Sequence, residues 1–294
     1  MRGTGMNITI NGENLDFSLE NEKTAGDVAD GIASWLEESG MVIGGILLDG
    51  ESAPLAENAW RAIPVEDVHS MDVEAVTLRE GVLRRLETAR DYFVLLEESA
   101  EAGNAEALAE LSETYPDLKT ILPDLLVGKG RPSLVPFMEQ ALAGAGFPIA
   151  EPSEADNAAI AAEAGKLAVI IEARRKEAAD PRKEAASAAA ALAALSGELE
   201  DVAVLLQTGK DKRAMDTIIR LTELLQALMR SLGWMDRRGT AGKIIEDFTG
   251  ILSELEEALK ASDTILIGDL MEYEIKPMLE DLPARLDTEE EIEP

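Results

Sequence analysis

The chain lacks cysteine, and other residue types that catalytic and metal sites use are scarce. Its 294 residues include one histidine, and aromatic residues make up 4% of the chain. The missing cysteine excludes disulfides, thiolate metal sites and a cysteine nucleophile. A single histidine, His69, excludes a metal site built from several histidines. With so few aromatic residues, the cores must consist mainly of aliphatic side chains.

Long hydrophobic runs are also missing, and basic residues are heavily outnumbered. No stretch of about 18 apolar residues occurs, so the sequence predicts no membrane-spanning helix. The N-terminus shows no apolar segment typical of a secretory signal, and we therefore expect a cytoplasmic protein. Fifty-eight acidic residues face 27 basic ones, which gives a net charge of -31. Because lysine and arginine carry the binding of nucleic acids and anionic lipids, we expect neither nucleic acid nor membrane as a partner.

The first 77 residues show the periodicity of strands. Asn11-Gly12 is a typical hairpin-turn dipeptide, and it separates two short strand-like stretches at 7–10 and 15–19. Apolar residues at 41–48 and an alternating stretch at 68–76 predict two further strands. This part of the chain is therefore expected to form a small sheet.

One helix is predicted between the second and third strands. Thr24 is placed to cap it, and Asp27 stands where a carboxylate completes a capping box. Val28, Ile32 and Trp35 then share one face of the helix. We therefore expect Trp35 to be buried in the core of this domain.

The order strand, strand, helix, strand, strand resembles the β-grasp fold of ubiquitin-like proteins. The residues that carry the resemblance are the hairpin Ile8/Ile10–Gly12–Phe17/Leu19, the helix Val28–Ile32–Leu36, the strand-turn Leu47-Leu-Asp-Gly50 and the strand Val68 to Val76. The resemblance implies a sheet that binds proteins. Conjugating and sulfur-carrying members of the family end in an exposed Gly-Gly. Here the last strand continues into a helix at Thr77, so that chemistry is not implied.

From about residue 78 the periodicity becomes helical. Pro116 and Pro123 predict interruptions of the helix at 105–126, and the dipeptide Asp180-Pro181 predicts a helix end. Later, leucine-rich stripes are joined by short linkers, which favour antiparallel neighbours and a helical bundle over residues 186–283. These stripes lie at 192–206, 218–232, 245–259 and 266–279.

The predicted fold class is therefore α+β. We expect a ubiquitin-like β-grasp domain at 1–77 and an all-helical domain at 78–287 that contains the bundle. The acidic tail at 288–294 is expected to be disordered.

No set of catalytic residues stands out in the sequence. Nothing like Gly-x-Ser-x-Gly surrounds a serine, and no Asp-x-Asp-x-Asp-Gly calcium loop is present. Residues 239–243 resemble only the end of a phosphate loop, because Ile244 stands where a serine or threonine should hold magnesium. We therefore predict no catalytic, cofactor-binding or metal-binding residues and no enzymatic activity.

Basic residues cluster where the chain turns, at 174–176, 182–183, 210–213 and 237–238. Such clusters either form a local positive patch or, as at 174–176, compensate the dipole at the C-terminus of a helix.

Two helical segments supply candidate partner-binding residues. Around 221–232 the apolar residues cover more than one face of the helix, which predicts either a helix central to the bundle or an interface. Near Pro277 the sequence predicts either a kinked core helix or a contact groove. The candidate partner-binding residues are Leu224, Leu228, Met229, Met271 and Tyr273.

These features favour a non-enzymatic intracellular adaptor or assembly factor with a protein partner, and the leucine faces allow a homo-oligomer. An acidic chaperone for an exported structural subunit, of the flagellar or secretion type, is a second interpretation. A metal- or phosphate-binding enzyme that uses carboxylates on the bundle is the third.

Overall fold

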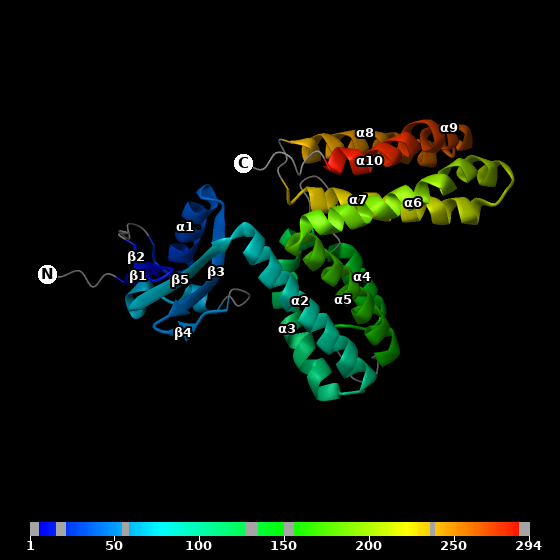
Figure 1. Ribbon diagram of the computed structural model, residues 1–294. Helices are drawn as coiled ribbons and strands as arrows, with labels where there is room; N and C mark the ends of the chain where they lie inside the picture. The colour runs from blue at the N-terminus through cyan, green and yellow to red at the C-terminus, as the bar shows by residue number, and fades with distance from the viewer. Residues whose placement is uncertain are drawn as a thin grey trace. The chain divides into compact units, whose positions relative to one another are not determined.

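The computed structural model describes residues 6–15, 22–54, 59–126, 135–149, 156–235 and 239–287. An N-terminal mixed sheet is followed by helices, which confirms the predicted α+β class (Figure 1). The chain divides into two compact units, Met1–Arg175 and Lys176–Pro294. The predicted tail at 288–294 and most of the predicted strand at 15–19 lie outside the described residues.

The sheet of the first unit has five strands in the order β2-β1-β5-β3-β4. Strand β1 pairs in parallel with β5, whereas the other neighbouring strands are antiparallel. Asn11 (φ 51°) and Gly12 (φ 81°) form the turn between β1 and β2, as the dipeptide predicts. The strands are β1 (Asn7–Ile10), β2 (Glu13–Asn14), β3 (Met41–Leu48), β4 (Glu51–Ser52) and β5 (Ser70–Thr77).

Helix α1 (Ala25–Glu38) packs on one face of the sheet and forms the core with it. Thr24 and Asp27 make the predicted capping box. Val28 of α1 and Met71 of β5 are fully buried in this core.

The prediction that Trp35 is buried is wrong, because half of its surface (50%) is exposed. Trp35 lies in the last turn of α1, at the edge of the apolar stripe, and Gly31 one turn earlier is also partly exposed. That flank of the helix is incompletely covered. The buried tryptophan of this unit is Trp60, whose Nε1 donates a hydrogen bond to the carbonyl of Pro54 at 2.8 Å.

The first unit continues into helices. Helix α3 is continuous, so the predicted interruptions at Pro116 and Pro123 are wrong. Each proline removes one backbone donor, but Tyr115 and Leu118 are buried beside Pro116, and this packing holds the helix together. The helices are α2 (Leu78–Glu101), α3 (Ala105–Leu126), α4 (Val135–Gly144) and α5 (Asn157–Ala179), the last of which ends just before the predicted break at Asp180-Pro181.

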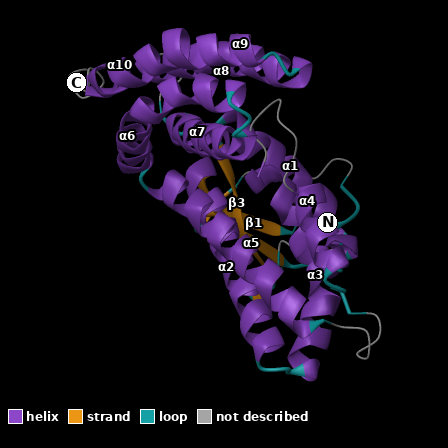
Figure 2. Cartoon of the chain, turned by 90° about the vertical axis from the view of Figure 1, so that its right-hand side faces the viewer, coloured by secondary structure: helices purple, strands orange, loops and turns teal. Residues whose placement is uncertain are grey.

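The second unit is a bundle of helices. Helix α6 contacts α7, α9 and α10, and α8 contacts the same three helices. All described strands precede Leu78. Figure 2 shows them as one sheet in a chain that is otherwise mostly helical. The elements are α6 (Pro181–Gln207), α7 (Asp211–Leu232), α8 (Thr240–Ala261), α9 (Thr264–Asp269), a π-helical segment (Leu270–Ile275) and α10 (Lys276–Asp287).

No helix among the described residues is both long enough and apolar enough to cross a membrane.

Candidate functional site

The structure places most of the candidate partner-binding side chains inside the second unit. Leu228, Met229 and Met271 are buried in its core, and Leu224 packs against that core while partly exposed. Their side chains therefore hold the bundle together, as expected for a central helix. Tyr273 differs, because 66% of its surface is exposed.

The helix is distorted just before Pro277. The π-helical segment ends at Ile275, and α10 starts at Lys276. Because proline lacks an N–H, it cannot complete the regular hydrogen-bond ladder one turn earlier. Tyr273 belongs to this π-helical segment, and its hydrogen bond with the neighbouring Glu272 raises the pKa of the Tyr273 hydroxyl.

Two turns of the bundle lie at the same end. The turn at 208–210 joins α6 to α7, and the turn at 262–263 joins α8 to α9 (Figure 1). Near these turns Ala203 of α6 lies against Gly268 of α9, where an added Cβ would come within 2.6 Å of the Ala203 Cβ. The absence of a side chain at Gly268 thus lets the two helices approach closely.

Exposed apolar side chains gather at this end of the bundle. They stand in the first or last two turns of their helices, and Ile265, at 67%, is the most exposed of them. Three cations, exposed as well, lie in the adjacent turn and in the first turn of α7. We call this set the bundle-end surface: Val204, Met215, Ile265 and Leu266, with Lys210, Lys212 and Arg213.

The three cations of this surface differ from those at 174–176. Lys210, Lys212 and Arg213 make no ion pair within the part of the chain that the structure describes. Arg175, by contrast, donates two hydrogen bonds to Glu172, at 2.8 and 2.9 Å, and its neighbours in that cluster also have interaction partners. The cluster at 174–176 is therefore compensated. The predicted cluster at 237–238 lies outside the described residues.

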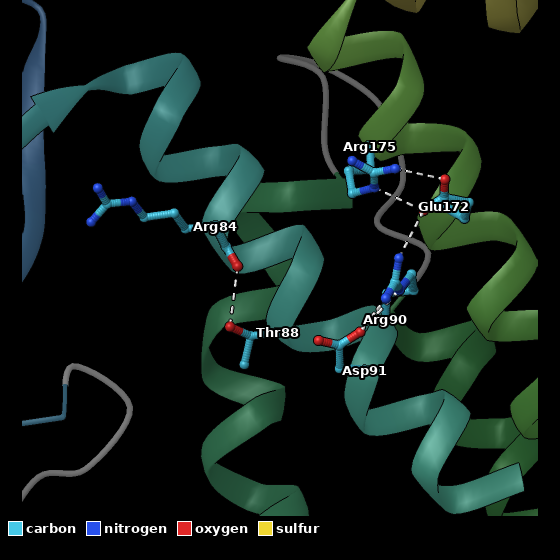
Figure 3. Close-up of polar contacts among 6 residues, drawn as sticks. All are labelled: Arg84, Thr88, Arg90, Asp91, Glu172 and Arg175. Carbon is cyan, nitrogen blue, oxygen red and sulfur yellow. Dashed lines mark hydrogen bonds and ion pairs between the residues drawn. The ribbon is translucent and has the colours of Figure 1, made fainter. Parts of the chain in front are cut away.

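A network of charges connects α2 to α5 in the first unit (Figure 3). Arg90 donates two hydrogen bonds to Asp91, at 3.0 and 2.6 Å, and its Nη1 lies 3.7 Å from a carboxylate oxygen of Glu172. Glu172 also binds Arg175 and holds the pKa of that guanidinium above its ordinary value. Acids and bases compensate each other here, so the network serves to fasten the two helices together.

A cleft of about 630 Å³ lies between the end of α2 and the start of α5. Its polar lining consists of Glu97, Glu101 and Asn157, and the remaining lining residues are alanines and Gly103. Carboxylates and an amide can accept hydrogen bonds or hold a cation, but they supply no strong nucleophile. Among the described residues no group of three or more histidine, aspartate or glutamate side chains is arranged to hold a metal ion.

The face of the sheet that points away from α1 is mostly polar. Thr9 donates a hydrogen bond to Asp72 at 2.6 Å, and Arg84 donates two to Glu74, which lowers the pKa of that carboxyl. Leu47, 43% exposed, lies beside Asp72 in the register of the sheet. A partner on this face would meet mainly polar groups.

The sequence reasoning found the cations of the bundle-end surface but missed its apolar members. Val204 lies between the core positions of a leucine-rich stripe, and Ile265 directly precedes the last stripe. One signal was available: the apolar pair Ile265-Leu266 opens a helix directly behind the capping residue Asp263, and both side chains are exposed there.

Two family models match separate parts of the chain. Residues 6–77 match the family described as "TP0873 N-terminal domain", and residues 185–284 match a domain of unknown function (DUF8042). The first segment contains the sheet, and the second contains most of the bundle. No curated protein and no solved structure shows significant similarity to the chain. The chain is therefore similar to one family in its sheet and to another in its bundle.

Proposed function

We propose that this chain is a non-enzymatic intracellular adaptor, and that the bundle-end surface contacts its protein partner. The observation that carries the proposal is the gathering of exposed aliphatic side chains at one end of a bundle that is otherwise well packed. Removing apolar surface from water is favourable by about 25 cal/mol per Å², and the entropic costs of association offset part of this gain. Exposed apolar surface that is gathered in one place is typical of protein interaction sites.

The N-terminal sheet supports the same proposal. Its order β2-β1-β5-β3-β4, with β1 and β5 parallel and α1 across one face, supports the interpretation as a ubiquitin-like β-grasp domain. That resemblance implies protein recognition. Because the open face of the sheet is mostly polar, we assign the main apolar contact to the second unit.

The proposal can be tested with the full chain as bait in its native host, followed by cross-linking and identification of the captured protein. Binding of that protein, once purified, is then measured against the double variant Ile265→Glu/Leu266→Glu. We expect an affinity loss of about tenfold or more, because two exposed apolar contacts are replaced by charges. The identity of the captured protein separates an adaptor from a chaperone, since a chaperone would hold an unassembled structural subunit.

Val169→Glu is the matched control, because Val169 is similarly exposed (71%) but lies on α5 in the first unit. This variant should bind the partner as the wild-type chain does. Equal binding by all three proteins would exclude the bundle-end surface as the partner site.

A further inference from the structure

Helix α2 follows strand β5 without a linker (Figure 1). The strand ends at Thr77, and the helix begins at the next residue, Leu78. The N–H of Glu80 donates a hydrogen bond to the Thr77 hydroxyl, and the N–H and hydroxyl of Thr77 both donate to the Glu80 carboxylate. The N–H of Leu78 donates to the carbonyl of Gly40, which directly precedes β3. The hydrogen bonds of the sheet therefore continue into the first turn of the helix.

Two glycines let α2 lie directly against the sheet. A Cβ on Gly81 of α2 would come within 2.6 Å of a methyl carbon of Val42 on β3. A Cβ on Gly44 of β3 would come within 2.8 Å of a methyl carbon of Val76 on β5 and within 3.2 Å of Nη1 of Arg84 on α2. The start of α2 is therefore closer to β3 and β5 than a side chain at either glycine would allow.

An ion pair crosses the same junction. Nη1 and Nη2 of Arg84 on α2 donate hydrogen bonds to the two carboxylate oxygens of Glu74 on β5, at 2.6 and 2.8 Å. The pair raises the pKa of the guanidinium and lowers the pKa of the carboxyl. Both side chains are half-exposed, so the pair adds little stability. Its two parallel hydrogen bonds instead fix the orientation of the helix relative to the strand.

We infer that β5 and α2 form one rigid lever, so that the sheet and α2 keep a fixed orientation and move together. Three separate contacts hold the junction: the capping box at Thr77, the packing at Gly44 and Gly81, and the ion pair of Arg84. A hinge requires residues that absorb changes in φ and ψ, and no residue stands between β5 and α2 to do so. The inference goes beyond the proposed function, because it does not depend on which surface binds the partner.

Other helices of the first unit are fastened to this lever. The 24 residues of α2 measure about 36 Å, so a rotation of the sheet by about 10° would move the far end of the helix by about 6 Å. Farther along α2, the Tyr92 hydroxyl donates a hydrogen bond to the carbonyl of Leu111 on α3. Arg90 of α2 pairs with Glu172 on α5. A partner that tilts the sheet would therefore also move α3 and α5.

Spin labels measure whether the sheet and α2 move together. Because the chain lacks cysteine, two engineered cysteines can be labelled selectively. The pair Ser34→Cys/Glu101→Cys spans the junction from α1, which packs on the sheet, to the end of α2. The pair Glu87→Cys/Glu101→Cys lies within α2 and is the matched control. All three side chains are exposed, so the labels should not disturb the packing.

The distances between the two labels are recorded on the full chain by double electron–electron resonance. We expect the distance distribution across the junction to be at most about twice as wide as the distribution within α2, because a rigid body adds no motion to that of the labels. A distribution several times wider, or one with two separate maxima, would show a hinge between β5 and α2 and would overturn the inference.

Gly81→Val tests the packing at the junction, and Gly144→Val is its control. A side chain at Gly81 clashes with Val42, whereas a Cβ at Gly144 of α4 meets no atom within 4 Å. Gly81→Val should widen the distribution across the junction by about twofold or more, because α2 must move away from β3. Gly144→Val should leave it unchanged. Equal distributions in the two variants would overturn the inference, and the measurement without a junction variant decides it if Gly81→Val does not fold.

Discussion

Arg230 and Glu177 form an ion pair with two hydrogen bonds of 2.7 Å each, from Nε to Oε2 and from Nη2 to Oε1. The Glu177 side chain, near the end of α5, is only 6% exposed, and Arg230 lies near the end of α7. Both residues belong to the second unit. The pair therefore anchors the segment that precedes α6 to the bundle.

Removing one partner of this pair should destabilise the second unit. Arg230→Ala removes two charged hydrogen bonds from the buried Glu177 carboxylate, and we expect a loss of about 2 to 4 kcal/mol in the free energy of unfolding. The measurement is urea denaturation followed by circular dichroism. The double variant Glu177→Met/Arg230→Met should be less destabilised, because it removes both charges. A loss below about 1 kcal/mol for Arg230→Ala would show that the pair behaves like an exposed one.

The close approach of α6 and α9 should not tolerate a side chain at Gly268. A Cβ there would clash with Ala203, so Gly268→Ala should lower the free energy of unfolding by about 1 to 3 kcal/mol. Gly250→Ala in α8 is the control, since a Cβ there meets open space, and it should stabilise the chain by up to about 1 kcal/mol. If thermal unfolding shows that both variants are stabilised, α6 and α9 do not approach each other as closely at Gly268 as described.

The two tryptophans of the first unit should differ sharply in their contribution to stability. Trp60→Ala removes a buried ring and its hydrogen bond, and should cost about 3 to 5 kcal/mol. Trp35→Ala changes a half-exposed side chain, and should cost about 1 kcal/mol or less. Denaturant unfolding of both variants measures the two losses. If Trp35→Ala costs more than Trp60→Ala, Trp35 is the buried ring, as the helical spacing predicts.

Trp35 also shows why the sequence predicts elements better than it predicts their surroundings. Helix α1 and its capping box follow from local spacing, and so does the turn at Asn11-Gly12. Whether Trp35 is covered depends on which other segments reach that flank of the helix, and this is set by contacts distant in sequence. The continuous helix at Pro116 has the same explanation, since burial of Tyr115 outweighs a local preference.

Acid should weaken the start of α1 through Asp27. The backbone N–H groups of Lys23 and Thr24 donate to its carboxylate and hold its pKa below the ordinary value. The stabilisation is therefore complete above the unfolded-state pKa and is lost as pH falls through the lowered folded-state pKa. NMR titration should find this low pKa, and Asp27→Asn should remove its share of the pH dependence. If the Asp27 carboxyl titrates at its ordinary pKa, the hydrogen bonds from Lys23 and Thr24 do not form in solution.

The candidate site was only partly accessible from sequence. The cluster at 210–213 is visible in the sequence, because its residues are contiguous. Its apolar neighbours come from three helices, and two of these helices, α6 and α9, meet at the contact between Ala203 and Gly268. No local pattern encodes that contact. Burial of Leu228 and Met271 likewise depends on how the helices assemble.

The most direct measurement is the footprint of the purified partner on the full chain, recorded by amide hydrogen exchange. We expect added protection at 203–216 and 263–268, which include the bundle-end surface, and little change around the cleft at Glu97. Protection confined to the open face of the sheet, around Leu47 and Asp72, would contradict the proposed partner site.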